Sequence, residues 1–325
     1  MPTRQQIHID RPLTNISVAY MQDASNFIAD KVFPIIPVQK QSDTYFIYNR
    51  DDFFRDEARV RAKGTESAGG TYEIEEAPPY FARKYAFHTD ITEEDVVNAD
   101  SPLTPRTDAA EFVSHKLMIK KENLWAQKYF RSGVWGTEIA GTADGTGENN
   151  TKQWDEPTAD PVAFIDNLRT MMQERTAYKP NTLVLSPYVF NALKNHPDII
   201  DLIKYTQRGV VTLDLIASLF EVDNVYVPSA IMNTQAKGKE GKYEFVMGKH
   251  ALLMYVEKSP GLKKPSAGYT FAWTGLKGAG AMGNRIVRIP MPWLGMDTER
   301  IEGEMAFDHQ IVGKDLGIFL KGIVK

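Results

Sequence analysis

The chain has 325 residues, of which 42% are hydrophobic and 25% are charged, and its formal net charge is −4. This is the composition of a globular protein with a large core, and the negative charge excludes a protein whose whole surface grips nucleic acid. Cysteine is absent, which excludes a disulfide framework, a thiolate zinc site and a cysteine nucleophile.

The composition of residues 1–40 indicates an extended arm rather than a folded lobe. Met1 to Arg11 is polar and lacks the apolar segment of a signal peptide, and no apolar run in the chain reaches the ~18 residues that span a bilayer. We therefore expect a protein made in a cytoplasm and without a membrane partner. A short helix ending near Lys31 is predicted, and the two prolines of Phe33 to Val38 exclude that stretch from a central strand. We expect residues 33–38 to lie extended on a surface that is not their own compact core.

Residues 41–92 predict a long β-hairpin. Strand formers run from Thr44 to Tyr48, Gly64 and Gly69 mark the turn, and a return strand starts at Thr71 and continues from Tyr80 to Ile91. About twenty residues on each side would reach up to roughly 60 Å at ~3.3 Å per residue. Because an isolated two-stranded ribbon is marginal in water, we expect a neighbouring molecule to complete it. A charged surface loop is the alternative.

The charged residues of this hairpin are the candidates for contacts between subunits. They are Arg55, Arg59, Arg61 and Lys63 near the tip, and Glu73 and Glu75 on the return strand.

The longest predicted element is a helix from Thr104 to Arg131. Thr104 suits the N-cap, Pro105 suits the first helical position, and Gly133 is a natural stop. Its apolar residues cover more than one stripe, so it should contact protein on more than one side. The remaining face is basic, with Lys116, Lys120 and Arg131. That face either contacts phosphates or keeps the protein soluble.

The second half of the chain predicts an α/β lobe followed by long strands. Residues 133–157, rich in Gly, Thr and Asn, predict a loop. Asp144 and Glu148 could hold a cation weakly, but a solvated loop without a cation is the favoured interpretation. Helices are predicted over 161–176, 186–193, 197–205 and 212–220, and strands over 182–186, 224–227, 243–247 and 251–257, with the last two paired across Gly248. Further strands are predicted over 269–274, 285–289, 298–312 and 316–324.

The sequence offers little catalytic chemistry. Gly278 to Gly283 matches GxGxxG, but a dinucleotide turn needs a helix next, whereas Arg285 to Ile289 reads as a strand. The six histidines are scattered, and no carboxylate pair stands out. We therefore predict no catalytic residue, no cofactor and no metal, and a protein that is not an enzyme.

The order of these parts resembles the major capsid protein of tailed bacteriophages, which has the α+β HK97-like fold. The residues that carry the resemblance are Phe27 to Pro34, Tyr85 to Ile91, the helix Thr104 to Arg131, and Thr182 to Pro187 before a helix. The resemblance covers nearly the whole chain. Its specificity lies in the order and lengths of the parts.

The resemblance implies four parts of the chain. Residues 1–40 form an N-terminal arm, and residues 41–92 form the extended loop that lies over an adjacent subunit. Residues 93–157 and 285–312 form the P-domain with its spine helix over 104–131. Residues 158–284 and 313–325 form the A-domain.

The resemblance also implies a function. Such subunits form pentamers and hexamers that close an icosahedral shell around double-stranded DNA, with the spine helix inside, so Lys116, Lys120 and Arg131 would face the DNA. Because no scaffolding region precedes the arm, a separate scaffolding protein is implied, with a portal and a decoration protein as further partners. The protein would be part of the virion, assembled in the host bacterial cytoplasm. The alternatives are an encapsulin-like compartment shell and a nucleotide-binding α/β enzyme.

Overall fold

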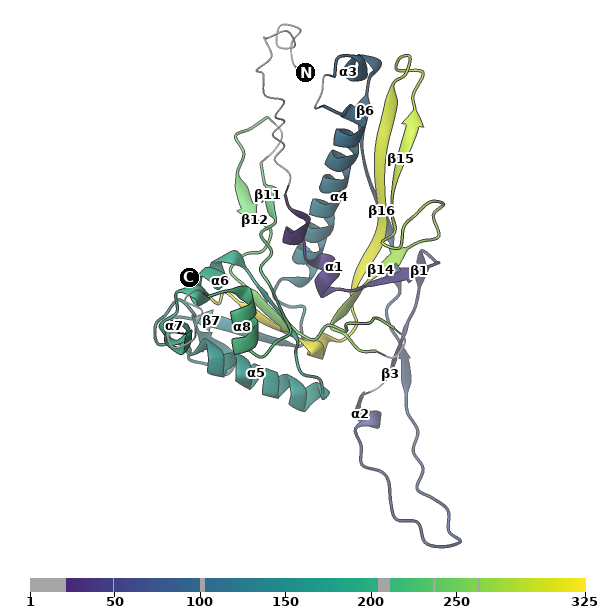
Figure 1. The fold of residues 1–325 in the computed structure, drawn as a ribbon. Coiled ribbons are helices and arrows are strands. Elements are labelled where there is room, and N and C mark those ends of the chain that lie inside the picture. Colours follow the sequence, from purple (N-terminus) through teal and green to yellow (C-terminus); the bar gives the residue numbers. More distant parts are fainter. Residues whose placement is uncertain (1–21, 49, 100–102, 204–210, 236–237, 262–263) are drawn as a thin grey trace.

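The computed structural model describes residues 22–48, 50–99, 103–203, 211–235, 238–261 and 264–325, and arm residues 1–21 lie outside this part of the chain. Figure 1 shows three parts: long strands beside one long helix, an α/β lobe near their lower end, and a ribbon that projects away from both. Within the described ranges, no helix combines the length and the apolar character that a membrane span requires.

The long helix is α4, Pro105–Tyr129, which confirms the predicted helix to within two residues. Asp108 accepts hydrogen bonds from the backbone N–H and the hydroxyl of Thr104, both at 3.2 Å. The start of the helix is therefore held by Asp108 reaching back, and not by the Thr104 side chain. Val113 on one side and Trp125 on another are both fully buried. The expectation that the helix contacts protein on more than one side is confirmed.

A five-stranded sheet forms around β16, Glu299–Ile311. β15 (Asn284–Pro290) and β6 (Arg83–Ile91) pair antiparallel with the same residues of β16, so they lie on its opposite edges. β14 (Gly268–Trp273) pairs antiparallel with the end of β16. β1 (Ile35–Val38) joins β14 in parallel at the edge of the sheet, where its proline is tolerated.

Helix α4 packs on one face of this sheet. Val113 and Leu117 form a small core with Met305 and Phe307 of β16. Gly303 lies beneath the helix, and a Cβ atom there would come within 2.5 Å of Val113 Cγ1. The absence of a side chain at Gly303 therefore allows the helix to approach the strand closely.

A six-stranded sheet forms the core of the α/β lobe. Its strands, in spatial order, are β10 (Asn224–Tyr226), β9 (Thr182–Leu185), β13 (Ala251–Met254), β17 (Gly317–Lys321), β7 (Thr137–Thr142) and β8 (Asn150–Lys152). Helices α5 (Pro161–Thr176), α6 (Pro187–Lys194), α7 (Pro197–Ile203) and α8 (Leu213–Leu219) belong to the same lobe. Asp160, Ser186 and Thr212 cap three of these helices through side-chain oxygens. The predicted helices of the lobe are confirmed within the described residues.

The remaining elements are short. They are η2 (Ala24–Asn26), α1 (Ala29–Val32), β2 (Ser42–Asp43), β3 (Phe46–Tyr48), α2 (Arg50–Phe53), β4 (Ile74–Glu76), β5 (Tyr80–Phe81), α3 (Glu93–Val97), β11 (Ile231–Asn233), β12 (Tyr243–Phe245) and η3 (Lys314–Leu316).

The predicted loop over 133–157 was wrong in part, because it contains β7 and β8. β7 pairs in parallel with the final strand β17, whose paired residues lie about 180 positions further along the chain. Polar, glycine-containing residues such as these have a weak strand preference of their own, and the pairing with a buried strand overrides it.

The predicted pairing of 243–247 with 251–257 was also wrong. β12 pairs with β11, while β13 lies between β9 and β17. All four residues of β13 are buried, whereas Tyr243 and Glu244 are exposed. A strand whose residues are all apolar is stable in the middle of a sheet, where both of its faces are buried. A strand with exposed polar residues, such as β12, does not fit that position.

The expectation that residues 33–38 lie on a surface other than their own core was wrong, because Phe33 is fully buried and Ile35–Val38 forms β1 in the sheet of β14. Ile28, Ala29, Val32 and Phe33 are all buried in one cluster with Trp125 of α4. The prolines that follow suggested an exposed stretch, but four closely spaced apolar side chains bury enough surface to anchor the arm.

The hairpin is also shorter than predicted. Residues 83–91 do not continue it, because they form β6 and pair with β16 along its length. Among its described residues, the projecting ribbon forms two short ladders, β2 with β5 and β3 with β4. Both sheets also draw strands from distant parts of the chain. β14 joins the sheet of β16, and β7 and β8 join the sheet of the α/β lobe.

Candidate assembly surfaces

The projecting ribbon is the most exposed part of the described chain. Every residue from 53 to 76 is exposed, and Figure 1 shows this segment extending away from both sheets. Its exposed apolar side chains include Phe46, Val60, Tyr72 and Ile74. Apolar side chains held this far from any core of their own chain mark a surface that a partner covers.

All six predicted contact residues of the hairpin lie on this exposed segment: Arg55, Arg59, Arg61, Lys63, Glu73 and Glu75. None of them forms an ion pair with another described residue. Arg61 Nε donates a hydrogen bond to the Thr65 carbonyl at 2.5 Å, and the Glu73 N–H donates to Asp52 at 2.9 Å. The charges of this segment are thus available to another molecule.

The three predicted DNA-facing residues are exposed on one flank of α4, far from the hairpin tip. Lys116 Nζ lies 5.3 Å from the Phe112 ring centroid, and Lys120 Nζ lies 5.9 Å from that of Tyr85. Arg131 is exposed just beyond the helix. The structure brings these three together on one side of the helix and does not bring them near the charged hairpin residues.

A buried carboxylate, which the sequence analysis did not single out, holds the root of the arm. Glu122 of α4 is 1% exposed, and its Oε2 accepts hydrogen bonds from the N–H groups of Ile28 at 3.0 Å and Ala29 at 2.9 Å. Burial raises the pKa of Glu122 to about 7, despite those two donors. Beside it, the buried Lys121 forms a 2.5 Å salt bridge with Asp30.

The raised pKa of Glu122 predicts a pH dependence of stability. The folded chain holds a proton on Glu122 up to about pH 7, whereas the unfolded chain releases it near pH 4.5. The free energy of unfolding should therefore fall as the pH rises from 4.5 to 7, by on the order of 3 kcal/mol from this group. Glu122→Gln, which is neutral at every pH and can still accept both N–H groups, should remove that slope.

Urea unfolding of the wild type and Glu122→Gln at pH 5 and pH 8 measures this contribution, since the difference between the two proteins cancels the other titrating groups. Glu148→Gln is the matched control, because Glu148 is exposed on a loop. It should keep the wild-type slope. Parallel pH profiles for wild type and Glu122→Gln would contradict the prediction.

A second set of buried hydrogen bonds, which links Phe33, Thr270 and His309, also holds the arm. Thr270 donates its hydroxyl proton to the Phe33 carbonyl at 2.9 Å. Because the Thr270 proton is used in that bond, His309 Nδ1–H donates the 2.8 Å hydrogen bond to Thr270 Oγ1. Burial lowers the pKa of His309 to about 3, so the ring stays neutral.

Two carboxylates of β16 tie three elements together. Glu299 binds Arg106 of α4 and Arg288 of β15, and the hydrogen bond from Arg288 is the main cause that lowers the pKa of Glu299. Burial acts to raise the pKa of Glu304, but hydrogen bonds from Arg285 and Lys84, each at 2.5 Å, lower it overall. These ion pairs join β6, β15 and α4 to the central strand.

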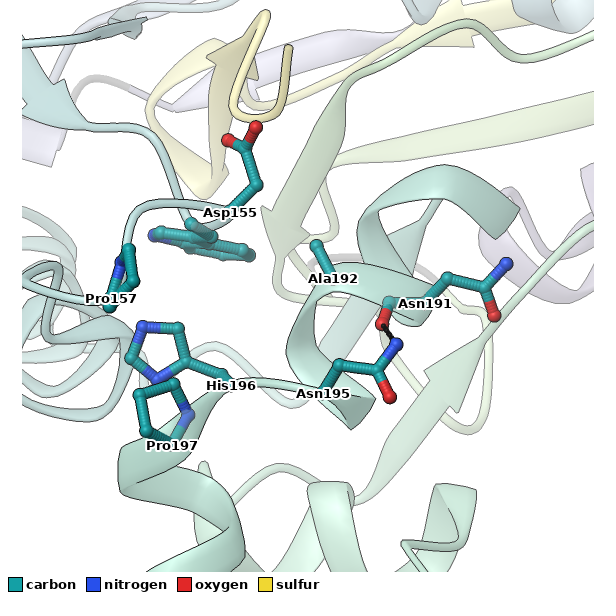
Figure 2. Close-up of a pocket in the computed structure, with 8 residues that line it drawn as sticks. Asp155, Pro157, Asn191, Ala192, Asn195, His196 and Pro197 are labelled. Atoms are coloured by element: carbon teal, nitrogen blue, oxygen red, sulfur yellow. Dashed lines mark hydrogen bonds between the residues drawn. The ribbon is translucent and has the colours of Figure 1, made fainter.

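A cavity of about 340 Å³ opens at the edge of the α/β lobe. Figure 2 shows His196 beneath Pro157, with Asn195 hydrogen-bonded to Asn191 at 2.9 Å. His196 Nε2 lies 3.3 Å from the Glu156 carbonyl. The cavity is lined by no cluster that could activate a nucleophile, and no group of three or more His, Asp or Glu among the described residues could hold a metal ion.

The glycine motif does not have the surroundings of a dinucleotide site. Gly278 and Gly283 have left-handed φ values of +79° and +66° in the turn between β14 and β15. A strand follows the turn, so no helix N-terminus faces it. The nucleotide-binding alternative loses the feature on which it rested.

Comparison with known proteins identifies the class of this fold. The family model of phage major capsid protein E matches residues 143–258. Over 97% of this chain, the sequence is 25% identical to the major capsid protein of Pseudomonas phage JBD67, covering 97% of that protein. It is 23% identical to that of Burkholderia phage BcepMu, covering 97% of this chain and 96% of the relative.

Solved structures share the fold across nearly the whole chain. A phage-related protein from Bordetella bronchiseptica has a TM-score of 0.69 at 21% identity, with 93% of each chain covered. The capsid of cyanophage P-SCSP1u has a TM-score of 0.59 at 12% identity, covering 98% of this chain and 93% of that one. An encapsulin from Synechococcus elongatus has a TM-score of 0.53 at 11% identity, covering 96% and 94%.

The chain therefore has the architecture of a viral capsid protein, the mixed helix and sheet HK97-like fold. Within that class it matches the major capsid proteins of phages, which form capsid shells, and the predicted resemblance is confirmed. The encapsulin alternative shares the fold, but the sequence relatives favour a phage capsid protein.

Proposed function

We propose that this chain assembles as pentamers and hexamers into an icosahedral shell that encloses the double-stranded DNA of a tailed phage. The observation that carries the proposal is the outer segment of the projecting ribbon, residues 53–76. This segment is wholly exposed and bears both apolar and charged side chains. A neighbouring subunit supplies the cover that the chain itself lacks, with Arg55, Arg59, Arg61, Lys63, Glu73 and Glu75 making the contacts.

The parts of the subunit then take the roles of the family. Residues 1–40 are the arm, 41–92 the extended loop, 93–157 and 285–312 the P-domain, and 158–284 with 313–325 the A-domain. Sheet membership supports moving β14 to the P-domain and β7 and β8 to the A-domain. The protein acts by assembly and not by catalysis, in the virion, after assembly in the host cytoplasm.

Further partners follow from this role: packaged DNA, a separate scaffolding protein, a portal and a decoration protein. Lys116, Lys120 and Arg131 contact DNA phosphates without reading sequence. The support is that all three are exposed on one flank and form no ion pair with a described residue.

Negative-stain electron microscopy of the purified full-length chain tests the proposed shell. Shells, capsomers or tubes are expected. A chain that stays monomeric in sedimentation at every concentration would overturn the proposal.

The proposed DNA contact predicts a salt-dependent loss. Lys116→Glu/Lys120→Glu/Arg131→Glu should reduce retention of linear duplex DNA at low salt and flatten its salt dependence, because each phosphate contact releases about one counterion. The matched control is Lys194→Glu/Lys249→Glu, which reverses two exposed lysines of the α/β lobe. Filter binding across a salt series measures both, and equal retention by the triple variant and the control would show that this flank does not contact DNA.

A further inference from the structure

The outer edge of β6 is open. Its nine residues pair with β16 on one edge, and no other described strand pairs with them. No backbone hydrogen bond outside that ladder reaches residues 83–91 from the described chain. The edge thus offers unpaired backbone N–H and C=O groups along about 30 Å, at ~3.3 Å per residue.

The open edge lies beside one flank of α4, and we call the surface between residues 83–91 and this flank the groove. Phe87 of β6 meets Phe112 of α4 edge-to-face with ring centroids 5.8 Å apart, although these rings are 39% and 44% exposed. Tyr85 lies next along the strand, beneath Lys120. The groove therefore has an aromatic floor that the chain leaves partly uncovered.

The lower end of the groove opens into a cavity of about 560 Å³ between the end of α4, β6 and β16. Arg83, Lys128 and Arg131 are among its lining residues, and Asp308 is its one lining carboxylate. Asp308 already accepts from Lys128 at 3.4 Å. Buried at this end is His309, whose Nε2 has no hydrogen-bond partner among the described residues.

The charge of the groove is mainly positive. Arg83, Lys116, Lys120 and Arg131 border it and form no ion pair with another described residue. Of the acidic side chains of α4, Asp108 lies at the helix start, where it accepts hydrogen bonds from Thr104, and Glu122 lies in the core. An occupant would therefore be negatively charged.

We propose that this groove binds an extended acidic peptide of a second protein, which adds to the open edge of β6 as a further strand. Main-chain hydrogen bonds to β6 give the peptide its direction and register, as in other strand additions. Phe87, Phe112 and the four cations all lie on the face of the sheet that α4 covers. On that face the peptide places an apolar side chain over the two phenylalanines and carboxylates toward the cations on either side of them. This peptide is a different partner from the neighbouring subunits of the shell. Its binding to the groove does not require a closed shell.

Duplex DNA matches fewer features of the groove than an acidic peptide does. Phosphates would satisfy the cations, but they leave the edge of β6 unpaired and the exposed phenylalanines uncovered. An acidic strand with one apolar side chain over Phe87 and Phe112 satisfies all three features. The same cations can serve DNA once the peptide has left.

Fluorescence anisotropy with a labelled nine-residue peptide, Glu-Thr-Glu-Thr-Val-Thr-Glu-Thr-Glu, tests this proposal on the full-length chain, because its odd positions place four Glu and the central Val on one face of the strand. We expect saturable binding that the same peptide with Lys in place of each Glu does not show. Phe87→Ala/Phe112→Ala should weaken binding of the Glu peptide about tenfold, since exposed aromatic anchors carry much of such binding. The same variant should leave retention of duplex DNA unchanged.

The matched control is Val97→Ala/Leu103→Ala, which removes two exposed apolar side chains outside the groove and should bind as the wild type does. Hydrogen exchange gives a second readout, because the bound peptide should slow exchange of amides within residues 83–91. Equal binding of both peptides, an unchanged dissociation constant in Phe87→Ala/Phe112→Ala, or retention of DNA alone would overturn the proposal. Shell formation is scored separately by electron microscopy, so failure of the shell and failure of the groove remain distinct results.

Discussion

Arg59→Glu/Arg61→Glu is expected to abolish shell formation while the chain still folds. Both arginines are exposed on the ribbon and lack an ion-pair partner among the described residues. Their replacement should therefore change the free energy of unfolding by no more than about 0.5 kcal/mol. In an assembled contact, like charges face each other after the reversal, at a cost of several kcal/mol. That cost recurs at every copy of the interface.

Sedimentation and electron microscopy measure the yield of shells, and thermal unfolding measures the fold. The matched control is Arg59→Lys/Arg61→Lys, which keeps both positive charges and should still assemble. Wild-type yield from the Glu variant would show that these charges only solvate the ribbon. Loss of assembly together with a large drop in melting temperature would show that the ribbon supports its own fold, contrary to its exposure.

Long elements with one clear period could be predicted from the sequence. α4 and β16 end within two residues of their predicted bounds, because capping residues and strand formers mark them locally. β7 could not be predicted in this way. Its place in the sheet is set by pairing with β17, which comes at the end of the chain, after the rest of the α/β lobe. No residue near β7 in the sequence signals that pairing.

The same contrast holds for the functional surfaces. The charged ribbon was predictable because charge and glycine content mark an exposed hairpin in the sequence itself. The groove beside β6 was not, since it depends on the pairing of residues 83–91 with β16 and on Phe112 meeting Phe87 across two elements. Glu122 had one local signal, a carboxylate three residues before a tryptophan in a broadly apolar helix. Its hydrogen bonds to Ile28 and Ala29 span more than ninety residues.

Phe33→Ala should be the most destabilising single change at the root of the arm. Phe33 is fully buried, and its ring centroid lies 5.0 Å from that of Tyr129 and 5.8 Å from that of Trp125. Removing a buried phenylalanine side chain costs about 3–5 kcal/mol, because the surroundings collapse only partly into the cavity. Urea unfolding should show this loss. Phe46→Ala is the matched control, since Phe46 is 62% exposed on the ribbon and should change stability by about 0.5 kcal/mol or less.

Gly268 allows a sharper test of the same packing. A Cβ atom at Gly268 would lie 2.4 Å from the Phe33 ring, so Gly268→Ala alone should destabilise by about 1–3 kcal/mol through overpacking. With Phe33 replaced by alanine, the new methyl group enters the space that the ring has left. The double variant should then be more stable than the sum of the two single changes predicts, by about 1 kcal/mol or more. Additive losses would mean that the ring and the glycine do not share one space, and that the arm is held chiefly by its hydrogen bonds to Glu122 and Thr270.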